Sequence, residues 1–270
     1  MKYCYYYSRG DSFPYFNELA ELSITYNKED LTLPQFLQEH KSQMINILIN
    51  KVEDLERLTL LYDQYKNIKI MFDLKNEDLI KKIPNIKIPF FFYTFINNWD
   101  VLTQVLSFHP TDIYISDELG FELAAVAKMA HAAGAQVRVL PNLAQTSWRE
   151  IEGHMHTQFN GLKKFFIRPE DVELYEPYVD VMEFAGNEKQ IATYYKIYAK
   201  EHKWFGDLNE IIIDLNYHID NRGIVSTFGE QRLKCGKKCL KGQHCQICER
   251  IAHLSQTLRE HDLIVQRDKG

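Results

Sequence analysis

Four cysteines near the end of the chain have the residue type and the spacing of a metal site. They form a Cys-x3-Cys-x5-Cys-x2-Cys pattern with glycines and lysines between them. Four thiolates in one short segment can surround a tetrahedral ion or hold an iron–sulfur cluster. Gly236 and Gly242 allow the tight backbone turns that such a site needs. The pattern predicts one metal site whose ligands are Cys235, Cys239, Cys245 and Cys248.

The spacing alone leaves the bound group open between structural zinc, an iron–sulfur cluster, and disulfides or unliganded thiols. His244 lies inside the cysteine segment and is an alternative to one of the thiols as a ligand. The first residues, Met1 to Asp11, lack the apolar core of a signal peptide, which predicts a cytoplasmic protein. Because thiols stay reduced in the cytoplasm, metal is favoured over disulfides.

The composition is that of a folded, water-soluble chain. It has 270 residues, of which 45% are hydrophobic and 26% are charged. Its apolar runs are shorter than the roughly 20 residues of a membrane helix, so no membrane partner is expected. The net charge of −5 argues against nucleic-acid binding by the surface as a whole.

Positive charge is concentrated around the cysteines. The segment from Arg232 to Arg250 contains six basic residues and one acidic residue, Glu249. This excess has two interpretations: it binds a phosphate backbone, or it offsets the charge of metal-bound thiolates. The residues predicted to contact nucleic acid are Lys234, Lys237, Lys238 and Lys241.

Upstream of the cysteines, short β-branched or aromatic runs alternate with amphipathic stretches, as in a parallel sheet with crossover helices. Eight such runs predict an α/β fold, a (β/α)8 TIM-type barrel with a C-terminal four-cysteine metal-binding extension. The predicted strands are Lys2 to Tyr7, Ile45 to Asn50, Ile68 to Leu74, Ile88 to Phe95, Asp112 to Asp117, Gln136 to Pro141, Lys164 to Arg168 and Val179 to Phe184.

Helical patterns separate most of these strands. Asn76 and Asn98 are expected to cap helices, and Gly134 is expected to end one in the left-handed conformation. The predicted helices are Val52 to Tyr65, Glu77 to Lys82, Trp99 to Phe108, Phe121 to Ala133, Trp148 to His156, Glu188 to Lys203 and Glu249 to Glu260. The barrel is predicted to occupy residues 1–186, and residues 187–270 are predicted to form a helical extension that packs on it.

A barrel carries its chemistry at the carboxyl ends of its strands, where this chain has polar residues. For any one of them a cap or loop role is the alternative, but as a ring they suit a polar substrate. The predicted catalytic, substrate-positioning residues are Asp117, Asn142, Gln145 and Arg168. Cys4, in the first strand, is expected to be packed inside the barrel.

Three strand-end segments resemble the collagenase-like peptidase family of unassigned mechanism, which is family thirty-two of the unclassified peptidases. They are Asp112 to Gly120, Val137 to Thr146, and Lys164 to Val172. The resemblance extends over roughly Ile68 to Tyr198, about half of the chain. It implies a barrel fold for this region.

Several better-understood members of that family are iron–sulfur proteins that hydroxylate RNA bases or quinone precursors without oxygen. The resemblance therefore implies a [4Fe-4S] cluster on the four cysteines and an RNA base or a related aromatic as the substrate. The chain departs from the family between Glu183 and Gly186, which lacks the family's cysteine and His-Gly pair.

Two other functions remain open at this point. One is a non-catalytic barrel with a zinc-stabilised basic module that binds nucleic acid or a protein partner. The other, a lesser alternative, is a peptidase, although the chain has no nucleophile elbow and no His-Glu-x-x-His motif.

Overall fold

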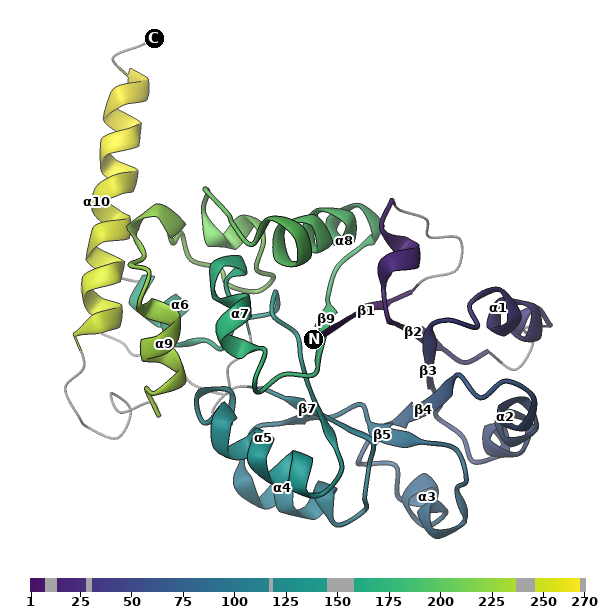
Figure 1. The fold of residues 1–270 in the computed structure, drawn as a ribbon. Coiled ribbons are helices and arrows are strands. Elements are labelled where there is room, and N and C mark those ends of the chain that lie inside the picture. Colours follow the sequence, from purple (N-terminus) through teal and green to yellow (C-terminus); the bar gives the residue numbers. More distant parts are fainter. Residues whose placement is uncertain (8–13, 28–30, 117–118, 145–157, 237–245, 268–270) are drawn as a thin grey trace.

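The computed structural model describes residues 1–7, 14–27, 31–116, 119–144, 158–236 and 246–267. Its centre is a nine-stranded, wholly parallel sheet with the strand order β5-β4-β3-β2-β1-β9-β8-β7-β6 (Figure 1). The strands are β1 (Lys2–Tyr6), β2 (Glu21–Thr25), β3 (Met44–Leu48), β4 (Ile68–Phe72), β5 (Phe90–Phe92), β6 (Phe95–Ile96), β7 (Asp112–Ile115), β8 (Gln136–Val139) and β9 (Val181–Phe184).

The sheet curls until its two edge strands come together. Only Tyr93 and Thr94 separate β5 from β6, yet β5 pairs with β4 and β6 pairs with β7. The Thr111 N–H, just before β7, donates a hydrogen bond of 2.8 Å to the Phe90 carbonyl of β5. An α/β fold with a curled parallel sheet of this kind is consistent with a TIM-like barrel.

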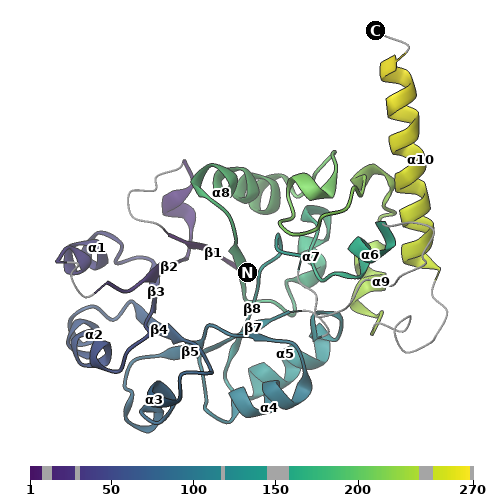
Figure 2. The same ribbon diagram turned by 180° about the vertical axis from the view of Figure 1, so that it is seen from behind.

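Helices cover the outer face of the sheet, and Figure 2 shows the same arrangement from behind. The apolar core lies between the two layers; in α5, for example, Leu123, Val126, Ala127 and Ala130 are all buried at helical spacing. The helices are α1 (Leu33–Glu39), α2 (Glu53–Gln64), α3 (Glu77–Ile80), α4 (Trp99–Leu106), α5 (Leu123–Ala132), α6 (Gln158–Lys163), α7 (Val172–Tyr175), α8 (Glu188–Tyr195), α9 (Phe228–Leu233) and α10 (Ile247–Arg267). A π-helical turn, Lys196–Glu201, continues α8.

The expected helix ends are confirmed. The Asn76 side chain accepts a hydrogen bond from the Leu79 N–H, and the Asn98 side chain accepts one from Val101. Gly134 has a φ of +81°, in the left-handed region that favours glycine. These residues fix where α3 and α4 begin and where α5 is followed by β8.

One strand prediction is wrong, and one strand was not predicted. The segment Lys164 to Arg168 is not a strand of the sheet, so β8 pairs directly with β9. At that segment, single hydrogen bonds replace a ladder; the Ile167 N–H, for instance, donates to the Pro141 carbonyl. The additional strand is β2, which comes from the irregular first crossover and lies between β1 and β3. β2 escaped prediction because its inward positions, Glu21 and Ser23, are polar and interrupt the apolar run.

The C-terminal segment packs against the rest of the chain through apolar and polar contacts. Phe184 of β9 lies against the rings of Tyr194 and Tyr198, with centroids 6.5 and 5.6 Å away. The Asp220 N–H donates to the hydroxyl of Ser255 on α10, at 2.7 Å. The helix predicted from Glu249 is confirmed and is longer than expected.

The predicted helix Trp148 to His156 lies outside the described residues, and the division at residue 186 stays a prediction. Among the helices that the structure describes, none has the length and apolar character needed to cross a membrane.

Candidate active site inside the curled sheet

The interior of the curled sheet is charged where barrels usually pack branched apolar residues. Side chains alternate along each strand, so that in β2 Leu22 and Ile24 join the main apolar core with the helices while Glu21 joins the charged interior. Five buried ionisable side chains from five strands belong to this interior cluster. They are Glu21, Lys69, Asp112, Arg138 and Glu183.

Arg138 of β8 is the centre of the interior cluster. Its Nη2 lies 2.5 Å from a Glu21 oxygen and 3.0 Å from an Asp112 oxygen, and its Nη1 lies 3.1 Å from Glu183. Burial opposes charge on the guanidinium, but Glu21 and Asp112 raise the pKa of Arg138 well above its usual value. The cluster therefore keeps Arg138 charged in a site with no solvent exposure.

Two lysines complete the charge balance. Lys69 lies 2.9 Å from Asp112 and 3.5 Å from Glu21, and Lys2, at the rim, lies 3.6 Å from Glu21. Burial would raise the pKa of Glu21, but attraction to Arg138 and Lys69 and hydrogen bonds from Arg138 and Asn46 lower it to about 2. With Lys2 included, three cations match the three carboxylates, which makes a stable buried cluster physically reasonable.

Aromatic side chains gather above this cluster, toward the carboxyl ends of the strands. The Tyr114 hydroxyl donates a hydrogen bond of 2.5 Å to Glu183. The Tyr114 ring is flanked by Tyr93 at 5.8 Å and Phe95 at 5.5 Å, and Tyr6 lies 6.3 Å from Tyr93. We call Tyr6, Tyr93, Phe95 and Tyr114 the aromatic mouth.

The aromatic mouth is only partly buried, and two of its phenols, those of Tyr93 and Tyr114, have raised pKa values. Tyr93 keeps 39% of its surface exposed, and Tyr6 and Phe95 are half-buried, whereas Tyr114 is fully buried. Burial, and then the charge of Glu183, raise the pKa of both Tyr93 and Tyr114. Both hydroxyls are therefore hydrogen-bond donors at neutral pH. That of Tyr114 donates to Glu183 inside the protein, whereas Tyr93 lies where a ligand can reach it.

Two predicted catalytic residues, Asn142 and Arg168, are buried and paired with the protein itself. The Asn142 amide group donates to the Ala185 carbonyl at 2.7 Å and accepts from the Ala185 N–H at 3.0 Å. Arg168 binds both oxygens of Asp171, at 2.7 and 2.8 Å, and also Asn221 at 3.2 Å. These contacts join the end of β8 to β9 and hold the C-terminal segment in place.

The other two predicted catalytic residues, Asp117 and Gln145, lie outside the described residues. Cys4 is fully buried inside the sheet, as expected, with its sulfur 3.4 Å from the Ser23 hydroxyl. Burial, followed by the charge of Glu183, raises the pKa of the Cys4 thiol, so it is a packed thiol and not a thiolate ligand.

Two of the four predicted metal ligands are described. Cys235 and Cys248 are half-buried, and both pack against the apolar core. Cys239 and Cys245 lie outside the described residues, as do Lys237, Lys238 and Lys241. Within the described ranges, no three His, Cys, Asp or Glu side chains come together as a metal site. Lys234 is exposed to solvent.

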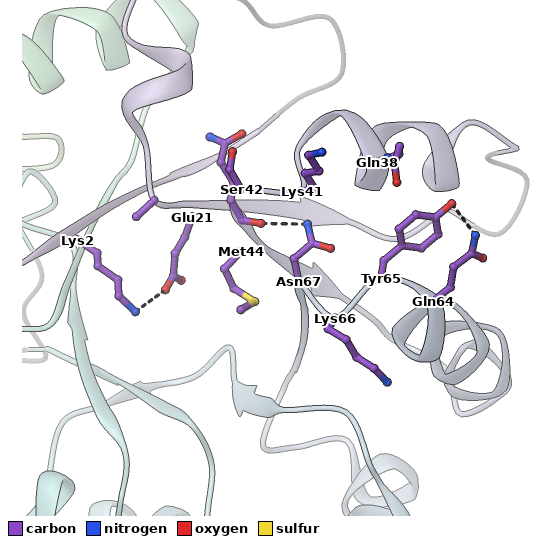
Figure 3. A pocket seen from close by; sticks show the side chains of 12 residues that line it. Lys2, Glu21, Gln38, Lys41, Ser42, Met44, Gln64, Tyr65, Lys66 and Asn67 are labelled. Carbon is purple, nitrogen blue, oxygen red and sulfur yellow. Dashed lines mark hydrogen bonds and ion pairs between the residues drawn. The ribbon is translucent and has the colours of Figure 1, made fainter.

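A cavity of about 640 Å³ opens at the opposite end of the sheet (Figure 3). Its lining includes Lys2 and Glu21, and also Gln43 and Asn67, which directly precede β3 and β4. These two amides donate to backbone carbonyls nearby, Gln43 to Leu19 at 3.0 Å and Asn67 to His40 at 3.1 Å. Because barrel enzymes place chemistry at the carboxyl ends of strands, the aromatic mouth is the stronger candidate.

The sequence did not predict the aromatic mouth as a site, because its residues lie within strands or at the break between β5 and β6. Tyr93 and Glu183 were considered among the polar residues at strand ends but were not chosen as catalytic residues. The sequence does contain a signal for the charged interior. Glu21, Lys69 and Arg138 are charged residues within otherwise apolar strand segments.

The fold and the site define an α/β protein with a curled parallel sheet and a charged interior. Over 99 residues the chain is 30% identical to a protein of Methanocaldococcus jannaschii described as an uncharacterized protease. The match covers 34% of this chain and only 28% of that protein. No protein family model and no solved structure matches the chain. The comparisons thus give a weak, partial similarity to a distant protein.

Proposed function

We propose that the chain is a barrel enzyme that carries out redox modification of an RNA base or a related aromatic, using a [4Fe-4S] cluster held by its four clustered cysteines. Oxygen-independent hydroxylation is the specific reaction proposed. The observation that carries the proposal is the aromatic mouth, which lies at the carboxyl ends of the strands directly above a buried acid, phenol and guanidinium.

The mouth has the chemistry for binding a planar ring. Stacking of a base on an aromatic side chain contributes about 1–3 kcal/mol and tolerates any base. Tyr93 and Phe95 offer such faces, and the Tyr93 hydroxyl can donate to a polar edge of the substrate. Glu183 and Arg138 lie beneath and position the Tyr114 ring. Asp117 and Gln145, which follow β7 and β8 in the chain, are proposed to complete the substrate contacts.

The residues present also fit a thiolate-bound centre. Near Cys235 and Cys248 is Arg232, whose carbonyl accepts a hydrogen bond from the Cys235 N–H at 3.0 Å. Burial lowers the pKa of Arg232, and the charge of Cys248 acts against that effect. Its Nε and Nη1 have no hydrogen-bond partner among the described residues. Four thiolates are the usual donors for an iron–sulfur cluster, which when bound would supply electrons to the reaction. Zinc, with the same donors, is the alternative.

Metal analysis tests the cofactor. Protein purified without air should be brown and should contain iron and sulfide in a ratio near one. Replacing Cys248 with serine should remove most of the iron. Colourless protein that holds one zinc ion per chain would reject the iron–sulfur proposal.

Substitution at the mouth tests the substrate class. Tyr93→Ala should weaken binding of short single-stranded RNA about tenfold or more, because one stacking face is lost. Tyr62→Ala, on the outer helix α2, is the matched control and should leave binding unchanged. Equal affinity of the wild type and Tyr93→Ala would remove the main support for an aromatic substrate.

The second candidate function is a zinc-stabilised basic module that binds nucleic acid or a protein partner. Exposure of Lys234 beside Cys235 favours it. Reversing the charge of Lys234, Lys237, Lys238 and Lys241 to glutamate should then abolish retention on nucleic acid while the metal content stays the same. Peptidase activity is the lesser alternative, and its support is the description of the distant relative as a protease.

A further inference from the structure

Arg232, in α9, is a buried cation to which no carboxylate among the described residues is hydrogen-bonded. It is 5% exposed, and its guanidinium lies over the rings of Phe166, Phe121 and Phe228 at 4.2, 5.1 and 5.2 Å. Its Nη2 donates to the Lys164 carbonyl at 2.5 Å. Among the described residues, Nε and Nη1 have no hydrogen-bond partner.

This arrangement leaves most of the charge on Arg232 uncompensated. Ring faces and one carbonyl attract a guanidinium, but a buried charge is normally paired with an opposite charge. Asp171 also acts on Arg232, yet both of its oxygens already accept hydrogen bonds from Arg168. Burial accordingly lowers the pKa of Arg232 below its usual value. The unpaired N–H groups of Arg232 can therefore bind an anion.

Two of the predicted metal ligands belong to the same part of the chain as Arg232. Cys235 follows Arg232 by three residues, and its N–H donates to the Arg232 carbonyl at 3.0 Å. Burial lowers the pKa of Arg232, and the charges of Tyr175 and Cys248 oppose that effect. We propose that Arg232 is the internal counter-cation of the thiolate centre, with its unpaired N–H groups donating hydrogen bonds to the metal-bound sulfurs.

This inference rests on the proposed metal centre but holds for either metal. Four thiolates around a zinc ion carry a net charge of −2, and four thiolates on an oxidised [4Fe-4S] core carry the same charge. A buried cation beside them stabilises the loaded centre in both cases. Hydrogen bonds to cluster sulfurs also raise the reduction potential of an iron–sulfur cluster.

Release of metal to a chelator tests the proposal on the full chain. The wild type, Arg232→Met and Arg232→Lys are purified without air, and loss of metal is followed by absorbance of the chelator complex. Arg232→Met should lose metal about tenfold faster or more, as expected when an outer partner of a metal ligand is removed. Arg232→Lys keeps the charge without the planar fork and should fall between the two.

Arg250→Met is the matched control, because Arg250 is exposed and lies two residues from Cys248. It removes one positive charge from the same segment and should release metal at the wild-type rate. Equal acceleration in Arg250→Met and Arg232→Met would overturn the proposal in favour of general surface charge. Wild-type retention in Arg232→Met would overturn it as well.

The outcome also separates this inference from the proposed function. If the wild type itself binds no metal, both fail. If the wild type binds metal and Arg232→Met keeps it equally well, the counter-cation role alone fails. Should Arg232→Met not fold, the comparison of Arg232→Lys with the wild type decides, because a lysine cannot donate from the positions of Nε and Nη1 together.

Discussion

Two buried arginines, Arg138 and Arg232, have opposite surroundings. Arg138 binds three carboxylates from three strands, whereas Arg232 has aromatic rings, one carbonyl and, among the described residues, no carboxylate hydrogen-bonded to it. Their pKa values move accordingly, upward for Arg138 despite burial and downward for Arg232 because of burial. Strands of the sheet supply the carboxylates that balance Arg138. Among the described residues, no carboxylate is hydrogen-bonded to Arg232.

Arg168 lies between these extremes, with one carboxylate partner, Asp171. Counted over the described residues, the number of carboxylate partners falls from three for Arg138 to one for Arg168 and none for Arg232. Removing an arginine leaves those carboxylates buried and unpaired, which is the main cost of breaking a buried ion pair. The series therefore predicts how strongly the fold depends on each cation.

Arg138→Met should cause the largest loss of stability. Three carboxylates would be left in the sheet with only Lys69 buried among them, so a decrease of about 5 kcal/mol in the free energy of unfolding is expected. Urea unfolding followed by circular dichroism measures it. A loss below about 1 kcal/mol would mean that the interior cluster is solvated and the comparison with Arg232 has no basis.

Arg168→Met should cost about 3 kcal/mol, because one carboxylate and the Asn221 side chain lose their buried donor. The double variant Arg168→Met, Asp171→Leu removes both charges and should recover much of the loss. Urea unfolding of the two variants, alongside the wild type, provides the measurement. If the single variant instead loses RNA binding without losing stability, Arg168 contacts substrate as the sequence predicted.

Acid should remove about 3 kcal/mol of stability through Glu21 alone. The folded-state pKa of Glu21 is about 2, below its ordinary value of 4.5, because Arg138 and Lys69 outweigh the effect of burial. A depressed carboxyl stabilises the fold above its unfolded pKa, and that stability is lost as the pH falls from about 4.5 toward 2.

Unfolding free energies measured across that pH interval check this expectation. Glu21→Gln is the control, because it removes the titrating group while keeping the shape of the side chain. Its unfolding free energy should vary less with pH than that of the wild type. Parallel pH profiles for the two proteins would show that Glu21 is not depressed.

Arg232→Met in metal-free protein should have the smallest effect, within about 1 kcal/mol in either direction, because no buried carboxylate is left behind. The methionine keeps an apolar side chain against Phe166 and Phe228, while the bond to the Lys164 carbonyl and the attraction of the charge to the rings are lost. Urea unfolding in the presence of a chelator measures it. A loss as large as that of Arg168→Met would place a strong partner at Arg232 that is not a metal centre.

The sequence predicted most of the fold because the strand residues that face the helices are apolar, as in other parallel sheets. Apolar alternation located seven of the strand regions, and asparagine caps located the starts of α3 and α4. β2 was missed for the same physical reason that the interior is unusual, namely that polar side chains replace apolar ones on its inward face. The rules that predict strands assume an apolar interior, and this interior is not apolar.

The candidate site was less predictable than the fold. Tyr6, Tyr93 and Tyr114 are far apart in the sequence, and only the curl of the sheet brings their rings together. Arg138 was noted within a strand motif, but its three carboxylate partners come from other strands and have no common spacing. Spacing identifies the cysteine segment because all four ligands are close in the chain; it cannot identify a site assembled from separate strands.

Tyr93 lies at the break between β5 and β6, so a ligand bound to its ring would also affect how the two edge strands are held together. Tyr93 belongs to the two-residue stretch that connects the two edge strands of the sheet, β5 and β6. A molecule stacked on Tyr93 would contact the junction between the two edge strands of the curled sheet, so ligand binding should stabilise that junction. Ligand capture and resistance to opening are thereby expected to rise together in this protein.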